Sequence, residues 1–170
     1  MKNIVTLIAV VFSATFAFAQ DVFEAARTND VVAIDKFVVG GGDVNAANPR
    51  GFTPLILAVY NNNEEAVLKL MEKGAKVDAQ DKSGNTALMG ATFKALPKMV
   101  DLLIKNKADV NLANYNNATA LIFAATFGQQ EIAKILLENG ADKSIVDSTG
   151  KTALQHATFQ ENLEMIQLLK

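Results

Sequence analysis

A threonine recurs at a constant spacing of 33 residues, at Thr53, Thr86, Thr119 and Thr152. In each unit a leucine follows two residues later and an alanine five residues later. Self-similarity at a fixed period of this length predicts a chain of repeated supersecondary units, which bury their apolar faces only by stacking on one another. The register therefore constrains the fold to a stack of small units.

Each unit is predicted to hold two short helices. A threonine side chain can accept hydrogen bonds from the free N–H groups at a helix start, and Pro54 suits the first helical position. Further along, Val67 and Leu70 share one helical face, and the other units repeat this aliphatic pair. A turn such as that over residues 74–78 closes the unit, with a glycine suited to a left-handed residue. We predict an all-α repeat solenoid of helix-turn-helix units with projecting β-hairpin loops.

The motif Gly51-Phe52-Thr53-Pro54-Leu55, followed by Ala58 and Gly74-Ala75, resembles the ankyrin repeat. The resemblance covers nearly all of the chain after residue 20 and implies a protein-binding scaffold. In this family, partners usually bind the concave surface formed by loop tips and first helices. The predicted repeat domain spans residues 20–170 and contains a capping repeat at 21–47, repeats at 48–80, 81–113 and 114–146, and a partial terminal repeat at 147–170.

The chain departs from the family pattern at several positions. The histidine that usually follows the leucine is absent, since Ile56 and its counterparts in the other units replace it. Lys107 stands where the helix-ending glycine is expected, and a non-glycine residue in the left-handed conformation costs roughly 1 kcal/mol, so we expect this helix end to be shaped differently. Asn117 replaces a turn glycine, which is milder because asparagine tolerates that conformation.

The first 19 residues have the pattern of a secretory signal peptide. Lys2 precedes an apolar run that ends in Ala17-Phe18-Ala19, and small residues stand at the two positions that a signal peptidase reads. The alternative, a membrane anchor, needs about 20 apolar residues, whereas polar sequence starts at Gln20-Asp21. We expect cleavage after Ala19 and a mature protein in a periplasm or secreted fraction, without a membrane segment. Ankyrin-like proteins of eukaryotes are mostly intracellular, so export favours a bacterial source.

Composition excludes several function classes. The chain has no cysteine, which excludes disulfides, thiolate zinc sites and a thiol nucleophile. Removal of residues 1–19 takes away Lys2 and leaves 15 basic residues against 18 acidic ones. The basic residues are scattered singly, whereas a phosphate-binding surface gathers them, so we expect no nucleic-acid partner.

The sequence offers no converging set of catalytic groups, and we assign no catalytic, metal-binding or cofactor-binding residues. His156 is the only histidine, and the carboxylates are spread along the chain. An enzyme hypothesis would pair His156 with Glu161 or Glu164 in a hydrolase. Glu64-Glu65 is interpreted as the acidic first turn of a second helix, and Gly40-Gly41-Gly42 as a helix-ending turn.

Aromatic residues and one arginine are the candidate contacts for a partner, because such side chains dominate interface energies. For Phe93 and Phe159, packing in the core is an equal alternative. Lys82, Asn85 and Lys94 are interpreted as ordinary solvated surface. The candidate partner-binding residues are Arg50, Phe52, Tyr60, Phe93, Tyr115, Phe127 and Phe159.

The sequence therefore predicts a monomeric, non-catalytic protein–protein interaction module that binds another protein on its concave face. A more specific alternative is an immunity or inhibitor protein that neutralises a toxic enzyme in the same compartment. The hydrolase is a further alternative. The last is a structural protein that self-associates through its carboxyl-terminal end, although we expect the apolar Met165, Leu168 and Leu169 there to be covered by the preceding unit.

Overall fold

The computed structural model describes residues 22–170, so the predicted signal peptide lies outside the described residues. A first helix spans residues 22–28. The helices that follow are α2 (Val31–Val39), α3 (Pro54–Tyr60), α4 (Glu64–Glu72), α5 (Ala87–Phe93), α6 (Pro97–Lys105), α7 (Ala120–Thr126), α8 (Gln130–Glu138), α9 (Ala153–Phe159) and α10 (Leu163–Leu169). No helix of the described part is long and apolar enough to span a bilayer.

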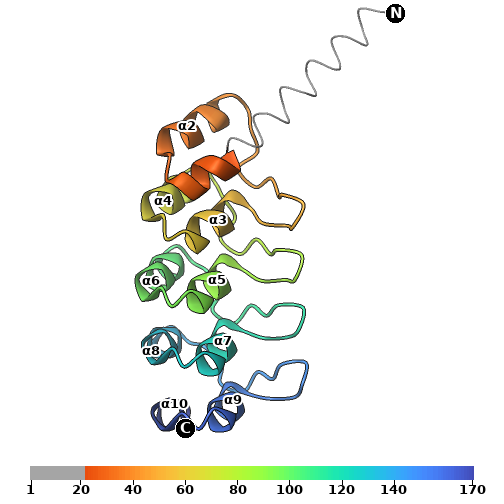
Figure 1. Cartoon of the computed structure of the whole chain (residues 1–170), viewed down its shortest axis with the longest axis vertical. Helices are drawn as coiled ribbons and strands as arrows, with labels where there is room; N and C mark the ends of the chain where they lie inside the picture. The colour runs from red at the N-terminus through yellow and green to blue at the C-terminus, as the bar shows by residue number, and fades with distance from the viewer. Residues whose placement is uncertain (1–21) are drawn as a thin grey trace, which may run out of the picture. The chain divides into compact units, whose positions relative to one another are not determined.

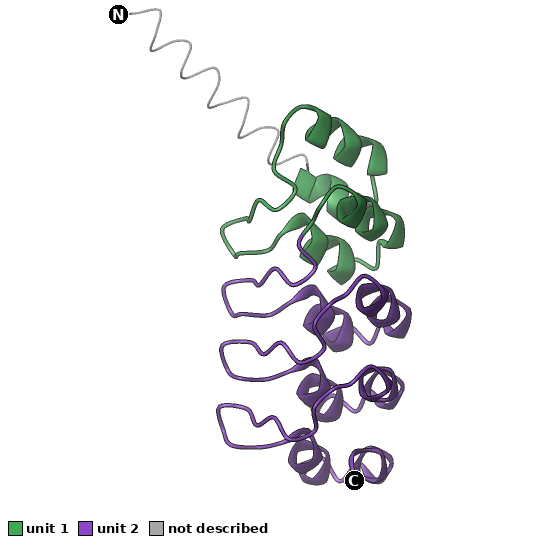
Figure 2. Ribbon diagram, turned by 180° about the vertical axis from the view of Figure 1, so that it is seen from behind, with its two compact units in different colours: residues 1–75 green, residues 76–170 purple. Residues whose placement is uncertain are grey.

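The chain divides into two compact units, residues 1–75 and 76–170 (Figure 2). In the described part of unit 1, α4 packs against both α2 and α3. Its core includes the fully buried Ile34 of α2 and Leu70 of α4. An ion pair also joins these two helices at the surface, where Lys73 Nζ lies 2.8 Å from Asp35 Oδ1.

Unit 2 repeats one helix pair three times. The first helices, α5, α7 and α9, form one row, and the second helices, α6, α8 and α10, form another (Figure 1). Contacts run both along and between the rows, since α7 packs against α5, α8 and α9. The conserved register of small and aliphatic residues explains this, because Leu88, Leu121 and their alanine neighbours are buried at the helix contacts. An all-α ankyrin-type repeat fold is confirmed.

The recurring threonines begin the first helices as predicted. Thr119 Oγ1 accepts a hydrogen bond from the Ile122 N–H at 3.4 Å, and Thr86 Oγ1 accepts one from Met89 at 3.3 Å. Thr53 and Thr152 cap α3 and α9 in the same way. Each cap satisfies a backbone donor that the helix start leaves free.

Left-handed residues recur at fixed positions in the register, after the second helices and at the loop tips. Lys107, just after α6, has φ 69°, near the 88° of Gly74 and the 86° of Gly140, so the expected change of shape at this helix end is wrong. Asn117, in the loop before α7, has φ 55°, and the left-handed conformation that asparagine tolerates is confirmed there. A second series lies in the turn between the two helices of a unit, where Ala95 has φ 54° and Glu161 has φ 53°. Sequence reasoning missed this series, because alanine and glutamate do not signal a left-handed turn.

The projecting loops are turns with little strand pairing. In the described residues the β-bridge assignment is limited to one isolated pair, Val146 with Thr152. Each loop tip is closed by a backbone hydrogen bond, such as that from Asp81 N–H to Asn85 O at 2.9 Å, and by a side chain, since Asp81 Oδ1 accepts hydrogen bonds from the Ser83 and Asn85 N–H groups. These short turns take the place of the longer backbone ladder of the predicted β-hairpin.

The helix at the carboxyl-terminal end is half covered. Met165 and Leu169 of α10 are buried and Leu168 is partly buried, so the expected burial is confirmed for the first two. Leu163 at the start of the same helix is 75% exposed. The apolar face of α10 therefore packs inward against α8 and α9, and its first turn stays open to solvent.

Candidate functional site

Three phenylalanines of α5 and α7 form an aromatic cluster on unit 2. The Phe93 and Phe127 rings meet edge to face, with centroids 5.2 Å apart, and the Phe123 ring lies 6.1 Å from that of Phe127. Phe93 and Phe127 are each 48% exposed. Core packing of Phe93, the alternative interpretation, is therefore wrong: its ring contacts another aromatic ring and remains open to solvent. We call Phe93, Phe123 and Phe127 the aromatic cluster.

Phe159 extends this aromatic character to α9. It is 76% exposed, which also overturns the core interpretation for this residue. Lys151, in the loop before α9, places its Nζ 5.4 Å from the centre of the Phe159 ring. A cation over an aromatic face is a favourable contact, worth roughly 0.5–1 kcal/mol at an exposed site.

In unit 1, as with Lys151 and Phe159 in unit 2, the residue just before the recurring threonine contacts the residue seven places after it. Phe52, in the loop before α3, stacks on Tyr60 at the end of α3, with ring centroids 5.9 Å apart. Both rings are half-buried, and the neighbouring Arg50 is exposed. These three predicted contact residues therefore lie together at one loop and one helix.

Tyr115 lies at the tip of the loop before α7 and is 71% exposed. Its ring covers Gly84 of the preceding loop, because a Cβ placed on Gly84 would lie 2.6 Å from both Tyr115 N and Cδ1. A backbone hydrogen bond from Tyr115 N to Ser83 O, 3.1 Å long, joins the same two loops. Tyr115 is thus exposed on one side and fixed on the other.

The loop tips and first helices of unit 2, residues 82–94, 115–127 and 148–160, are named here the first-helix surface. It contains four of the predicted partner contacts, which the structure spreads over all three helix pairs. The aromatic cluster joins Phe93 to Phe127, whereas Tyr115 lies on a loop tip and Phe159 contacts Lys151. Phe123 was missed, although it stands four residues before Phe127 on the same helical face.

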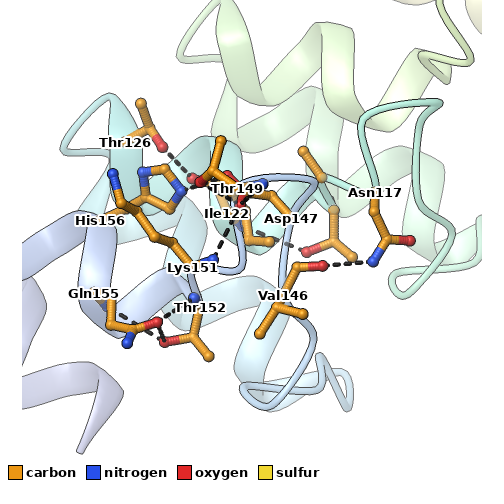
Figure 3. Close-up of polar contacts among 12 residues, drawn as sticks. Asn117, Ile122, Thr126, Val146, Asp147, Thr149, Lys151, Thr152, Gln155 and His156 are labelled. Carbon is orange, nitrogen blue, oxygen red and sulfur yellow. Dashed lines mark hydrogen bonds and ion pairs between the residues drawn. The ribbon is translucent and has the colours of Figure 1, made fainter.

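His156 contacts Asp147, and not the glutamates considered for a hydrolase. Its Nε2 lies 2.7 Å from Asp147 Oδ2, which joins α9 to the loop before it (Figure 3). A hydrogen bond from the Thr149 hydroxyl holds the pKa of the Asp147 carboxyl well below its ordinary value. Partial desolvation opposes this by raising the pKa, and hydrogen bonds from the Lys151 N–H and from His156 lower it further. These contacts fasten the loop to the helix.

The described residues hold no group of three or more His, Asp or Glu side chains arranged to bind a metal ion. Asp147 also shares its carboxylate with two backbone N–H groups of its own loop, those of Thr149 and Lys151. Asp147 thus joins its own loop to His156 of α9. The sequence did not predict the contact between Asp147 and His156, because the two residues are brought together only when the loop folds back against α9.

The described helices and loops define a protein built from repeated pairs of antiparallel helices. The family model for ankyrin repeats (3 copies) matches residues 22–114 and 93–170. The chain belongs to the ankyrin repeat family. Members of this family are generally protein–protein interaction modules and typically non-catalytic. A search of curated proteins finds no match to the chain.

Proposed function

We propose that this protein is a non-catalytic binding module that holds a partner protein on the first-helix surface of unit 2. The observation that carries the proposal is the aromatic cluster, because Phe93 and Phe127 are each 48% exposed while contacting one another. Large aromatic side chains in contact on a surface are the anchors around which protein interfaces form.

The cluster is also held in place before binding. Phe93 and Phe127 lie at the ends of α5 and α7, and these two helices pack against each other. The edge-to-face contact further restricts the two rings. Because these two side chains are already restricted, covering them with a partner costs less of their side-chain entropy than covering flexible side chains would.

We further propose that the protein acts after export, in a periplasm or as a secreted protein. This part rests on the signal-peptide pattern of residues 1–19. Mass spectrometry of the protein purified from its source should find Gln20 as the first residue. A protein that retains Met1 in the cytoplasm would overturn the export proposal and leave the binding proposal standing.

Partner binding is tested by affinity capture from the envelope and secreted fractions of the source, with wild-type protein beside a Phe93→Ala/Phe127→Ala variant. The matched control is Leu163→Ala, which removes an exposed apolar side chain of α10, a second helix. We expect one protein to be retained by wild type and control and lost from the double variant. Retention by all three would place binding elsewhere on the chain. Capture of a toxic enzyme would favour the inhibitor alternative.

A further inference from the structure

Charge is segregated on unit 2. The three segments of the first-helix surface contain Lys82, Lys94, Lys151 and His156, and not one Asp or Glu. The chain as a whole has more acidic than basic residues, 18 against 16. Because the three segments have lysines and no carboxylates, the electrostatic potential over this surface is more positive than over the rest of the acidic protein.

Two aspartates border this surface, and both are engaged inside their loops. Asp81 is buried and accepts hydrogen bonds from the N–H groups of Ser83 and Asn85. Asp147 is bonded to Thr149, Lys151 and His156. Their charges are therefore compensated by local donors and do not cancel the lysines on the outer side of the loops.

The lysines remain available to a partner. Lys82 and Lys94 are exposed, and within the described residues they form no ion pair, whereas Lys105 of α6 is paired with Asp101 at 2.6 Å. Lys94 directly follows Phe93 of the aromatic cluster, and Lys151 lies over Phe159. The nearest exposed carboxylates in sequence, those of Glu131 and Glu161, follow the first helices outside the three segments.

We infer that the partner presents an acidic peptide segment with an apolar anchor residue to the first-helix surface. The anchor contacts the aromatic cluster, and carboxylates on either side of it approach Lys94 and Lys151. This inference rests on the proposed function and names the chemistry of its partner. Complementary charge of this kind selects partners and speeds their association more than it adds affinity.

Single-stranded nucleic acid is the competing ligand, since bases stack on aromatic rings and phosphates attract lysines. A nucleic-acid surface needs a cationic groove along the backbone, whereas the three lysines here are dispersed over two of the three segments and no arginine accompanies them. An acidic peptide needs only one or two such contacts beside its anchor. The observations therefore favour the peptide.

The test is a selection from a library of random linear peptides displayed on phage, with the protein expressed from its full-length coding sequence as bait. We expect enriched peptides to carry Asp or Glu within a few residues of an aromatic or aliphatic residue. Synthetic peptides from this set should bind about tenfold more weakly to a Lys94→Glu/Lys151→Glu variant, and binding should weaken as salt is raised. Lys134→Glu/Lys143→Glu, with the same charge change outside the three segments, should bind like wild type.

The outcomes separate the two proposals. Peptides that are lost with Phe93→Ala/Phe127→Ala but show no acidic bias would overturn the acidic-segment inference and leave the proposed function intact. Peptides that ignore both variants would overturn the location as well. Failure to enrich any peptide, or tighter binding of a single-stranded oligonucleotide than of every selected peptide, would also overturn the inference. Circular dichroism of each variant establishes that the loss is not one of folding.

Discussion

The two repeats of unit 2 that begin at Thr119 and Thr152 share one motif, yet their first helices are buried to different extents. In α7 five of the seven residues are buried, whereas in α9 only Ala153 and Ala157 are. Within the described residues α7 packs between α5 and α9, and α9 has a first helix on one side only. The residues that face the open side differ accordingly, since Ile122 and Ala125 of α7 correspond to Gln155 and Thr158 of α9.

The comparison separates what makes a helix from what makes it stable. The cap is the same in both units, and α9 even gains a capping box because Gln155 Oε1 accepts a hydrogen bond from Thr152 N–H at 2.8 Å. Local sequence therefore starts both helices equally well. Burial by neighbours on both sides then stabilises α7 more than α9.

The largest expected effect is a difference between two matched leucines. Leu121→Ala should lower the free energy of unfolding by about 3–4 kcal/mol, because Leu121 is fully buried. Leu154→Ala, the same change at the same place in the motif, should cost about 1–2 kcal/mol because Leu154 is only half-buried. Urea denaturation followed by circular dichroism measures both. Equal losses would show that neighbours do not set the stability of these helices.

Two loop-tip glycines, Gly84 and Gly150, are expected to differ in the loss of stability that their substitution causes. Gly84→Ala should destabilise by about 2–3 kcal/mol, since a Cβ would strike Tyr115 and φ is also positive. Gly150→Ala meets no atom within 4 Å and should cost only the backbone strain, about 1 kcal/mol. Thermal unfolding of the two variants tests this. Because the added Cβ would also strike the Tyr115 backbone nitrogen, removing the Tyr115 ring should not restore stability in full. Equal losses for Gly84→Ala and Gly150→Ala would contradict the close contact at Gly84.

Backbone strain in the turn between the two helices of a repeat should not depend on how deeply the helices are buried, because strain is set by the local backbone conformation. Ala95 has φ 54° and Glu161 has φ 53°. Glycine at either position should stabilise the protein by up to about 1 kcal/mol, and by similar amounts in the two units. Gly128, which already fills this position in the intervening unit, is the natural precedent. Destabilisation by Ala95→Gly in urea titrations would mean that the turn carries no strain.

The smallest expected effect concerns acid stability at the last loop. The pKa of Asp147 is lowered from its ordinary value of 3.8, so its charged form adds stability above that pH, which is lost as pH falls through the lower folded pKa. Asp147→Asn should make unfolding less pH-dependent below about pH 4. Asn114 occupies the same position in the preceding loop with the same backbone contacts, so the variant is expected to fold.

The control for this experiment is Asp142→Asn, an exposed loop aspartate that also has a pKa lowered by its own turn, chiefly through the Ser144 hydroxyl. Because Asp142 is exposed and contacts no histidine among the described residues, we expect a weaker change in acid stability from this variant. An acid-unfolding profile unchanged by Asp147→Asn would contradict a stabilising role for the Asp147 contacts.

Sequence reasoning reached the features that repeat and missed those that depend on local packing. Thr119 was assigned as a cap from its place in the register, whereas a changed helix end was expected at Lys107, which in fact keeps the left-handed conformation of the glycines at equivalent positions. Ala95 has no such marker in its own residue type. The contact between Asp147 and His156 joins two parts of the chain whose separation follows no helical or strand period, so no pattern announces it.

The same limit applied to the surface. The aromatic residues were identified from position, but only the structure could decide that Phe93 and Phe159 are exposed, since an aromatic residue at a helix end suits a core as well as a surface. Lys94 was interpreted as solvated surface because a lone lysine carries no pattern. Its relation to the aromatic cluster emerges once the helices are placed side by side.

The register described above keeps two sets of positions apart. In the repeats that begin at Thr53, Thr86 and Thr119, the threonine, leucine and alanine of the motif are buried and start or pack the first helix. The residues near the end of that helix, such as Phe93 and Phe127, are exposed. Mutational drift at the outward set can therefore change what the protein recognises while leaving the inward set untouched. Related proteins with this scaffold can therefore acquire new partners without changes in the residues that determine the fold.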